Sequence, residues 1–248
     1  MYTCFSDRER SIISVPETAS TNNDIKDIIK KSGSPVFSAV TAERQTAGRG
    51  RLGRSFLSPV GGLYFSASYP LTGKEANIPF LTLLAGLAVN EAIRELTGIN
   101  TLIKWPNDIY LNNKKLCGIL TELVTFRGLT AIVGIGLNLT ETDFPEEIRD
   151  IATSFAKEGI SPPEKTELIK KITEILDRLV YEEYSLYNVN KNITAELKEK
   201  SYSLGKTVSY RLADESITGV VTDIRSTGAA VITLPDGTEK EIFCGEII

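Results

Sequence analysis

Three glycines and three arginines fall within the nine residues 47–55, which read AGRGRLGRS. Glycine exposes backbone N–H groups and lets the main chain approach a ligand closely. Arginine adds a planar charge that binds carboxylate or phosphate through two parallel hydrogen bonds. This segment, called the arginine loop below, therefore suits a small ligand that carries both a carboxylate and a phosphate. By itself it also fits a solvated loop or a nucleic-acid arm.

Two common phosphate-binding loops do not match the arginine loop. A Walker A loop continues with Lys and Ser or Thr after its last glycine, whereas Gly53 is followed by Arg54. A Rossmann loop opens a helix, and the residues 56–59, FLSP, do not resemble a helix start. Neither standard nucleotide fold is therefore predicted.

A second polar block, IKWPNDIY at residues 103–110, contains the only tryptophan of the chain, Trp105. Lys104 suits a phosphate. Asp108 suits Mg²⁺, which favours one or two carboxylates together with phosphate oxygens. Taken alone, the block fits a surface hairpin with ordinary salt bridges equally well.

Two further blocks place small residues in predicted strands: KKLCGILTE at 114–122 and GIGLN at 134–138. A glycine inside a strand, such as Gly118, often marks a place where a ligand comes close. Lys115, three residues earlier, would then lie along the same ligand. A hairpin with solvated lysines explains the first block alone, and close packing of small residues explains the second.

Composition excludes several function classes. The chain has no histidine, so a Ser-His-Asp triad, a Cys-His dyad and a His-ligated zinc site are all excluded. Its net charge of -4, from 28 Lys+Arg and 32 Asp+Glu, argues against a general nucleic-acid binder. Three widely separated cysteines indicate a reducing, cytoplasmic setting. No apolar run is long enough for a membrane span, so no membrane association is predicted.

Hydrophobic periodicity predicts a mixed α/β body followed by a small β module. Helices are predicted at 24–31 and 78–96, with helical character from 145 to 200. Strands are predicted at 35–40, 62–69, 103–111, 116–124 and 131–139. The tail is predicted to hold short strands at 207–210, 219–222, 230–234 and 240–243, with a hairpin at Asp236-Gly237.

In this order the four blocks resemble the catalytic domain of biotin protein ligases. The match rests on Ser20-Thr21-Asn22, residues 45–54, Ser58-Pro59, 61–66, 104–108, 115–120 and 134–138. The resemblance implies an α+β fold, with a mixed sheet flanked by helices as in class II aminoacyl-tRNA synthetases. It places this catalytic domain at residues 1–200 and a small SH3-like β-barrel at 201–248, where Gly205, Gly219, Gly228 and Gly245-Glu246 match the family.

The resemblance also implies a two-step reaction. Biotin and MgATP give biotinyl-5′-AMP and pyrophosphate, and a lysine of a biotin carboxyl carrier protein then takes the biotinyl group. The residues implied for biotin are Ser20, Thr21, Asn22, Gln45, Gly48, Arg49, Gly50, Arg51, Lys115 and Gly118. Those implied for ATP and the adenylate are Arg49, Arg51, Arg54, Phe56, Lys104, Trp105, Asn107, Asp108 and Asn138. Arg51, Lys115 and Asp108 are the candidate catalytic residues, and Asp108 is also the candidate Mg²⁺ ligand.

Two features set this chain apart within the resemblance. Phe56 stands where the family usually carries a tryptophan near the adenine, so ATP affinity is the property expected to differ. About 18 residues precede Ser20, too few for the DNA-binding domain of some members, so no DNA binding through it is predicted. Members without that domain are often homodimers, and a homodimer is expected here.

Three other functions remain as alternatives. A lipoate or octanoyl ligase shares the fold, but its glycine-rich pattern is not found here. A catalytically silent biotin sensor is disfavoured because Lys115, Arg51 and Asp108 are all present. Single-strand nucleic-acid binding is disfavoured by the net charge and by the lack of aromatic residues within the arginine loop.

Overall fold

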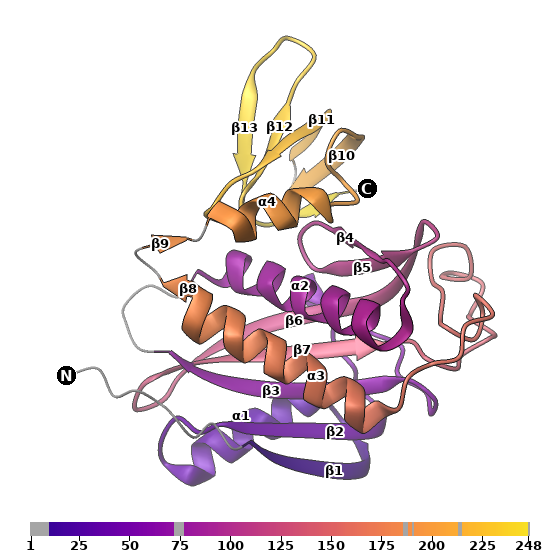
Figure 1. Cartoon of the computed structure of the whole chain (residues 1–248), viewed down its shortest axis with the longest axis vertical. Helices are drawn as coiled ribbons and strands as arrows, with labels where there is room; N and C mark the ends of the chain where they lie inside the picture. The colour runs from indigo at the N-terminus through magenta and orange to yellow at the C-terminus, as the bar shows by residue number, and fades with distance from the viewer. Residues whose placement is uncertain (1–9, 72–76, 186–187, 190, 213–214, 248) are drawn as a thin grey trace.

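The computed structural model describes residues 10–71, 77–185, 188–189, 191–212 and 215–247, and its two main sheets are shown in Figure 1. The main sheet has seven strands in the order β1-β2-β3-β7-β6-β5-β4, and the C-terminal sheet has five in the order β13-β12-β11-β10-β14. The strands of the main sheet are β1 (Ser11–Thr18), β2 (Ser38–Gln45), β3 (Leu63–Leu71), β4 (Leu102–Lys104), β5 (Asp108–Leu111), β6 (Lys114–Thr125) and β7 (Leu129–Leu137). The C-terminal sheet consists of β10 (Thr207–Leu212), β11 (Glu215–Ile224), β12 (Ala230–Thr233), β13 (Glu239–Ile242) and β14 (Glu246–Ile247).

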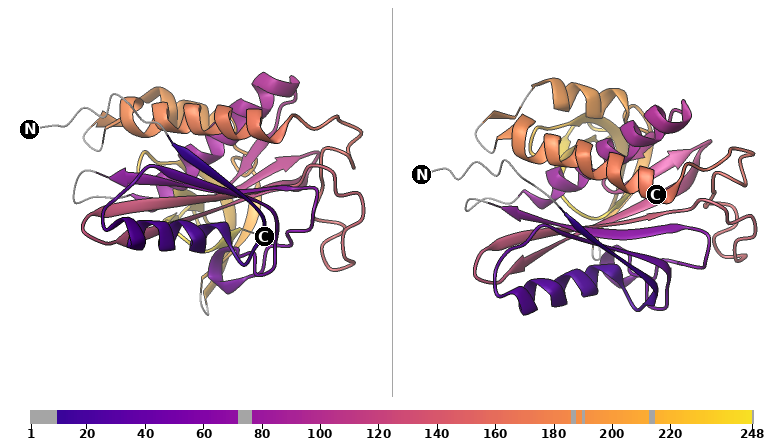
Figure 2. Two further views of the ribbon diagram at one scale, coloured as in Figure 1. Left: turned by 90° about the horizontal axis from the view of Figure 1, so that it is seen from below. Right: turned by 60° about the horizontal axis from the view of Figure 1, so that its bottom comes forward.

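Helices cover both faces of the main sheet. The helices that do so are α1 (Thr21–Ser32), α2 (Ile78–Thr97) and α3 (Lys165–Arg178). A further helix, α4 (Lys191–Glu199), contacts β11 of the C-terminal sheet, and a short hairpin of β8 (Tyr184–Ser185) and β9 (Asn188–Val189) precedes it. Figure 2 shows α1 against one face and α2 with α3 against the other. The main sheet is therefore the middle of three layers.

Local sequence explains how the helices pack and end. The amphipathic α1 buries Ile25 and Ile29 against Val40 and Ile132 of the sheet. The apolar α2 packs against both the sheet and α3, so it is buried on most sides. Gly98 ends α2 in the left-handed conformation with φ of 72°, and its N–H donates to the carbonyl of Arg94.

Strand register brings small residues together on the face that α1 covers. Gly118 of β6 pairs with Gly136 of β7, which in turn pairs with Tyr64 of β3. One step along, Gly134 of β7 lies between Ser66 and Leu120. Because side chains alternate along a strand, both rows point to the same side. Because these glycines have no side chains, the centre of this face is a depression. We call Gly118, Gly134 and Gly136 the glycine floor.

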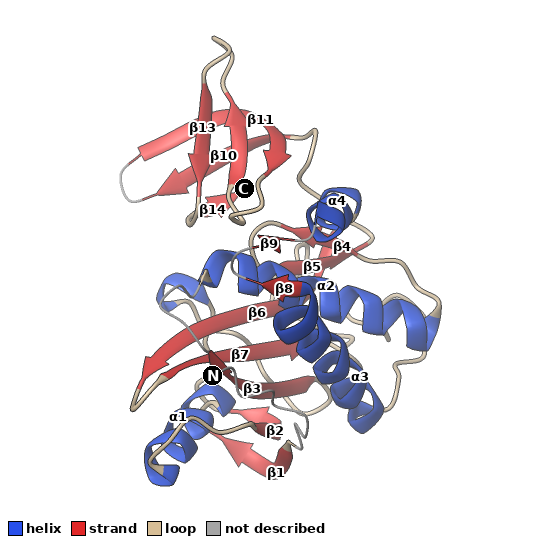
Figure 3. Ribbon diagram, turned by 60° about the vertical axis from the view of Figure 1, so that its left-hand side comes forward, coloured by secondary structure: helices blue, strands red, loops and turns tan. Residues whose placement is uncertain are grey.

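The C-terminal sheet stands at one end of the body, as Figure 3 shows. The indole N–H of Trp105 donates to the carbonyl of Gly228 at 2.9 Å, and Asn77 donates to the carbonyl of Thr227 at 2.6 Å. The hairpin predicted at Asp236-Gly237 is confirmed between β12 and β13, with Gly237 at φ of 86°. Closure of this sheet into an SH3-like barrel stays a prediction.

Three predicted element boundaries were wrong. Residues 103–111 are not one strand but the β4–β5 hairpin, turned at 105–107 with a cis peptide between Trp105 and Pro106. Within the region 145–200, where helical character was predicted, the described helical segments are α3, the short π-helix Leu179–Glu183 that follows it, and α4, while 139–164 forms turns and loops. The strand predicted at 35–40 runs from Ser38 to Gln45. Local apolar content does not reveal where a strand turns back on itself.

The strand β1 was not predicted, and neither were the two-residue strands β8, β9 and β14. The β1 strand pairs in parallel with β2 at the edge of the main sheet, and most of its side chains are exposed. Its hydrophobic pattern is weak because little of it is buried.

Among the described residues no helix is both long and apolar enough to cross a bilayer. Cys117 is buried, Cys244 is exposed, and Cys4 lies outside the described residues.

Candidate active site

A cavity of about 350 Å³ lies on the glycine floor, beside the N-terminal end of α1. Of the described residues that line it, five are cations and one is a carboxylate, Asp108. The cations are Arg49, Arg51, Arg54, Lys104 and Lys115. The whole chain is net negative, so this local excess of positive charge favours an anionic ligand.

The glycine floor has no room for side chains. A Cβ on Gly134 would lie 2.1 Å from Oδ1 of Asn22, and one on Gly136 would lie 2.4 Å from Cε1 of Phe56. A Cβ on Gly118 would lie 3.0 Å from Cε2 of Phe56. The ring of Phe56 thus rests on two of the three floor glycines, and Asn22 rests on the third.

Hydrogen bonds order the end of the cavity next to α1. Gln45 Oε1 accepts from the backbone N–H of Thr21 at 3.0 Å, and its Nε2 donates to Ser58 Oγ at 2.9 Å. The hydroxyls of Thr21 and Ser66 are 2.7 Å apart, and Ser66 donates to Asn22 Oδ1. Buried Ser20 is the N-cap of α1. This end offers neutral amide and hydroxyl groups in fixed positions.

Glu122 connects this polar end to the arginine loop. Its carboxylate accepts from Asn22 Nδ2 at 2.8 Å and Lys26 Nζ at 2.7 Å, and it lies 3.2 Å from Arg49 Nη2. Partial burial would raise the pKa of Glu122, but hydrogen bonds from Lys26 and Asn22, with the charges of Lys26 and Arg49, outweigh it. The pKa is held below its ordinary value.

The arginine loop is a tight hairpin over the cavity. Gly50 N–H donates to the carbonyl of Arg54 at 2.7 Å, and Phe56 N–H donates to the carbonyl of Gly48 at 2.9 Å. At its tip Leu52 has φ of 55° and is 71% exposed. The loop therefore presents its tip to solvent while its arginines lie along the cavity wall.

The arginines reach different partners. Arg49 donates to Asn23 Oδ1 at 2.8 Å, toward α1. Arg51 donates to Asn107 Oδ1 at 3.0 Å and to the carbonyl of Gly245 at 3.1 Å. The loop thus joins the α1 end of the cavity to the β4–β5 end.

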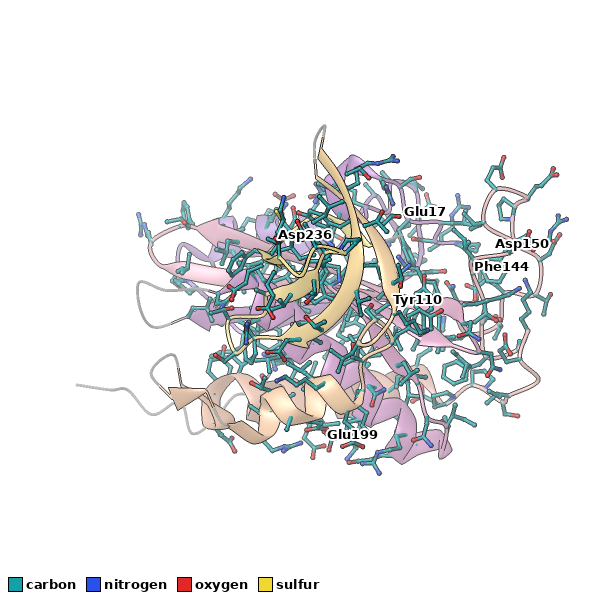
Figure 4. The ribbon with its side chains drawn as sticks, turned by 90° about the horizontal axis from the view of Figure 1, so that it is seen from above. Glu17, Tyr110, Phe144, Asp150, Glu199 and Asp236 are labelled. Carbon is teal, nitrogen blue, oxygen red and sulfur yellow. The ribbon has the colours of Figure 1, made fainter. Side chains whose placement is uncertain are left out.

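The β4–β5 turn forms the charged end of the cavity. Lys115 Nζ lies 2.7 Å from Asp108 Oδ1. Lys104 Nζ donates to the hydroxyl of Tyr110 at 3.2 Å. Burial, with the charge of Asp108, raises the pKa of Tyr110 to about 12, so this hydroxyl keeps its proton at neutral pH. Figure 4 labels Tyr110, and Phe144 and Asp150 mark the loop after β7.

The structure brings the predicted site residues together except for two. Gly48 does not line the cavity, and a Cβ there would lie 2.4 Å from the carbonyl oxygen of Phe56, so it serves the loop hairpin. Asn138 is buried and does not line the cavity, and its Nδ2 donates to the carbonyl of Thr153 at 2.9 Å. Those that do line the cavity are Ser20, Thr21, Asn22, Gln45, Arg49, Gly50, Arg51, Arg54, Phe56, Lys104, Trp105, Asn107, Asp108, Lys115 and Gly118.

Among the residues that sequence reasoning missed, Tyr110 and Gly245 line the cavity, and Glu122 and Ser66 hydrogen-bond to residues that line it. Glu122 lies two strand periods after Gly118, so the alternation of β6 gives a signal that places both on one face. Ser66 and Tyr110 come from strands that were predicted, but only the register shows that they face the site. Gly245 is far in sequence from the other site residues, and its match to the family did not indicate that it lines the cavity.

Magnesium has limited protein ligands here. In the part of the chain that the structure describes, no three or more Cys, Asp or Glu side chains are grouped so that they could hold a metal ion. Asp108 is the cavity carboxylate, and Mg²⁺ commonly takes one or two carboxylates with the remaining ligands from phosphate and water. The donor set fits a metal carried mainly by a nucleotide.

Comparisons with known proteins agree on one family. The family model described as "Biotin/lipoate A/B protein ligase family" matches residues 14–139. "Bifunctional ligase/repressor BirA" of Bacillus subtilis is 33% identical over 226 residues, which cover 88% of this chain and 68% of that protein. "Biotin--[acetyl-CoA-carboxylase] ligase" of Mycobacterium tuberculosis is 28% identical, over 96% of this chain and 89% of the relative. The solved biotin protein ligase from Aquifex aeolicus in complex with biotin and ATP superposes with a TM-score of 0.79 at 35% identity, covering 96% of this chain and 97% of that one.

Proposed function

The chain belongs to the biotin/lipoate A/B protein ligase family, and we propose that it is the ligase that activates biotin with MgATP and transfers it to a carrier-protein lysine. The observation that carries the proposal is the gathering of five cations around one cavity on the glycine floor. The Aquifex aeolicus ligase holds biotin and ATP in the same fold.

In the first step, an oxygen of the biotin carboxylate attacks the α-phosphorus of ATP. A carbon–oxygen–phosphorus linkage forms, the bond from the α-phosphorus to the bridging oxygen breaks, and pyrophosphate leaves. The carboxylate is already deprotonated at neutral pH, so no general base is needed and a chain without histidine suffices. Two anions must be brought together, so positioning and positive charge supply most of the catalysis.

The residues divide between the two substrates by their place in the cavity. The neutral amides and hydroxyls beside α1 suit the ureido ring of biotin, with Ser20, Thr21, Asn22 and Gln45 around it. Lys104, Asn107 and Asp108, on the opposite side of the arginine loop, suit the nucleotide phosphates. Arg51 and Lys115 then flank the linkage between them, where they offset charge on the phosphoryl oxygens. Asp108 would hold a Mg²⁺ ion that arrives with the nucleotide, and that ion would supply further neutralisation of the phosphate charge.

In the second step, the amine of the carrier lysine attacks the biotinyl carbonyl carbon. A carbon–nitrogen bond forms, the bond from that carbon to the phosphate oxygen breaks, and AMP leaves. The attacking amine must lose a proton, and Asp108 is the cavity carboxylate placed to orient it and accept that proton.

The organisation of the chain follows from the same proposal. We place the catalytic unit at residues 1–200 and the C-terminal unit at 201–248, with a biotin carboxyl carrier protein as the partner in the cytoplasm. A homodimer is part of the proposal, supported by the exposed edge strand β1 with Ile12 and Ile13 at 40% and 42% exposure. Sedimentation of the purified protein tests it, and a monomer at all concentrations would contradict it.

A transfer assay tests the proposed function. The protein is incubated with ATP, Mg²⁺ and a biotin-acceptor domain, with either biotin or lipoate as the acid, and the acceptor mass is measured. The proposal predicts one biotinyl group on the acceptor, dependent on ATP. Lipoyl transfer would instead favour a lipoate ligase, and biotin binding without transfer would favour a silent sensor.

A further inference from the structure

The C-terminal sheet reaches into the cavity at a single described turn. Gly245, which separates β13 from β14, lines the cavity together with the arginine loop. Its carbonyl accepts from Arg51 Nη2 at 3.1 Å. The two residues are 194 positions apart in the chain, so only the docked C-terminal sheet brings them together.

The Gly245 turn is itself held in place. The hydroxyl of Tyr210 in β10 donates to the carbonyl of Cys244 at 2.6 Å, and β14 pairs with β10 directly after the turn. Gly245 has φ of 113°, and a Cβ there would lie 2.3 Å from Cε2 of Tyr210. A side chain at this position would therefore both strain the backbone and push the turn off the tyrosine ring.

The other side of Arg51 is fixed just as firmly. Its Nη1 donates to Asn107 Oδ1 at 3.0 Å, and Asn107 Nδ2 donates in turn to the carbonyl of Ile119 at 3.0 Å. The guanidinium therefore bridges the β4–β5 turn and the Gly245 turn. A planar donor group held at both edges has little freedom to swing out of the cavity.

We propose that the Gly245 turn, seated on Tyr210, is a positioning device that sets Arg51 in the cavity before any substrate binds. This rests on the proposed function, in which Arg51 flanks the carboxyl–phosphate linkage. The three glycines give the arginine loop a high conformational entropy, which is lost when the loop becomes ordered. Entropy that is already lost on folding is not lost again when the transition state forms, so the reaction barrier is lower. The C-terminal sheet thus acts on the adenylation step through an arginine that belongs to another part of the chain.

The variants that test this are Gly245→Ala, Tyr210→Phe and the matched control Gly237→Ala. Gly237 also has positive φ, 86°, in the same sheet, but it lies in the β12–β13 turn and does not line the cavity. All three substitutions weaken the C-terminal sheet locally, so changes in melting temperature alone do not distinguish them. Tyr210→Phe removes one hydroxyl and keeps the ring, which guards against a Gly245→Ala chain that fails to fold.

The first readout is hydrogen exchange of residues 48–56 in the unliganded protein. Gly245→Ala and Tyr210→Phe are expected to speed exchange at Gly50 and Arg54, whose N–H groups close the loop hairpin, while Gly237→Ala leaves them unchanged. Equal exchange in all four proteins overturns the proposal. This readout does not depend on catalysis, so it stands even where the proposed function fails.

The second readout is the single-turnover rate of biotinyl-AMP formation, measured on the folded protein with biotin and MgATP. Gly245→Ala is expected to lower this rate roughly tenfold with little change in the KM for ATP, since placement rather than ground-state binding is lost. In an Arg51→Gly background the same change is expected to add no further loss, because the guanidinium that the carbonyl holds is gone. An equal loss in both backgrounds overturns the proposal. Absence of biotin-dependent activity in the parent protein contradicts the proposed function instead.

Discussion

Lys115 and Asp108 carry opposite charges 2.7 Å apart at the edge of the glycine floor. Lys115→Ala removes a cation placed to neutralise the reacting oxygens, so biotinyl-AMP formation is expected to slow by roughly 10²-fold and biotin binding to weaken. Rapid-quench measurement of adenylate formation checks this. Lys114→Ala is the matched control, because Lys114 precedes Lys115 in β6 and does not line the cavity. Unchanged kinetics in Lys115→Ala would remove this lysine from the mechanism.

Glu122 makes the stability of the folded protein depend on pH. Its pKa is lowered on folding, so its contribution to stability is present above the ordinary value of 4.5 and is lost as the pH falls through the lower, folded value. Glu122→Gln is expected to reduce the free energy of unfolding by about 1 kcal/mol at pH 7, a figure discounted for the partly exposed Arg49. The deficit should shrink as the pH falls below 4.5.

Urea unfolding of both proteins at several pH values measures this difference. Glu17→Gln is the control, since its partner Arg44 and Glu17 itself are about half exposed, at 52% and 51%. Such surface pairs contribute little. A Glu122→Gln deficit that is the same at every pH would show that the carboxylate charge is not its source.

At the residue scale, sequence reasoning found the charged groups but not all of their partners. The arginines and lysines of the cavity stand out because their types and glycine neighbours are unusual. Glu122 was not singled out, although strand alternation from Gly118 places it on the same face. Asn138 was expected at the nucleotide, but it anchors the loop at Thr153 instead of lining the cavity. A buried amide and a ligand-binding amide look alike in sequence.

At the scale of elements, the glycine floor is the feature most sensitive to change. Gly134→Ala places a Cβ 2.1 Å from Asn22 Oδ1, so α1 must shift or the asparagine must turn away. Loss of about 1–3 kcal/mol of stability and at least a roughly tenfold weaker biotin affinity are expected. Calorimetric titration with biotin and urea unfolding measure the two effects.

Gly86→Ala in α2 is the matched control for that experiment. Its Cβ would meet Ile103 Cγ2 at 3.5 Å, an ordinary contact, and alanine favours a helix interior over glycine. It is expected to stabilise the protein by about 0.5–1 kcal/mol and to leave biotin affinity unchanged. Loss of biotin affinity in both variants would mean that the effect is general and not a property of the floor.

The tip of the arginine loop around Leu52 is expected to move in the unliganded protein while Arg51 stays held by Gly245, and to close over biotinyl-AMP, which protects the intermediate from water. The contact between Arg51 and Gly245 limits this movement without abolishing it. Trypsin should therefore cleave within residues 49–54 more slowly when biotin and ATP are both present. Equal cleavage in the two states, followed by mass spectrometry of the fragments, would contradict closure.

Elements with strong local signals were predictable, and those set by long-range pairing were not. The α2 helix follows from its apolar run and Gly98, and the β5–β6 turn follows from Asn112 and Asn113, which have φ of 49° and 64°. The exposed β1 strand has no such pattern, because its place depends on pairing with β2. The β4–β5 hairpin was not predicted either, because the turn inside residues 103–111 depends on the pairing of β4 with β5.

At the scale of the whole molecule, positive charge is concentrated at the cavity although the chain as a whole is net negative. The chain carries -4 overall, yet the cavity lining has five cations to one carboxylate among the described residues. The C-terminal sheet adds the carbonyl of Gly245 to that lining, a placement that only the docked structure reveals. Both sheets therefore contribute groups to the cavity proposed to hold the reacting anions.

The most direct test of the proposed function is exchange of labelled pyrophosphate into ATP. Reversal of adenylation returns label to ATP only when an acyl-adenylate forms in the cavity. Exchange is expected to require biotin, to be absent without an acid, and not to be supported by lipoate. No biotin-dependent exchange, or equal exchange with lipoate, would contradict the proposed function.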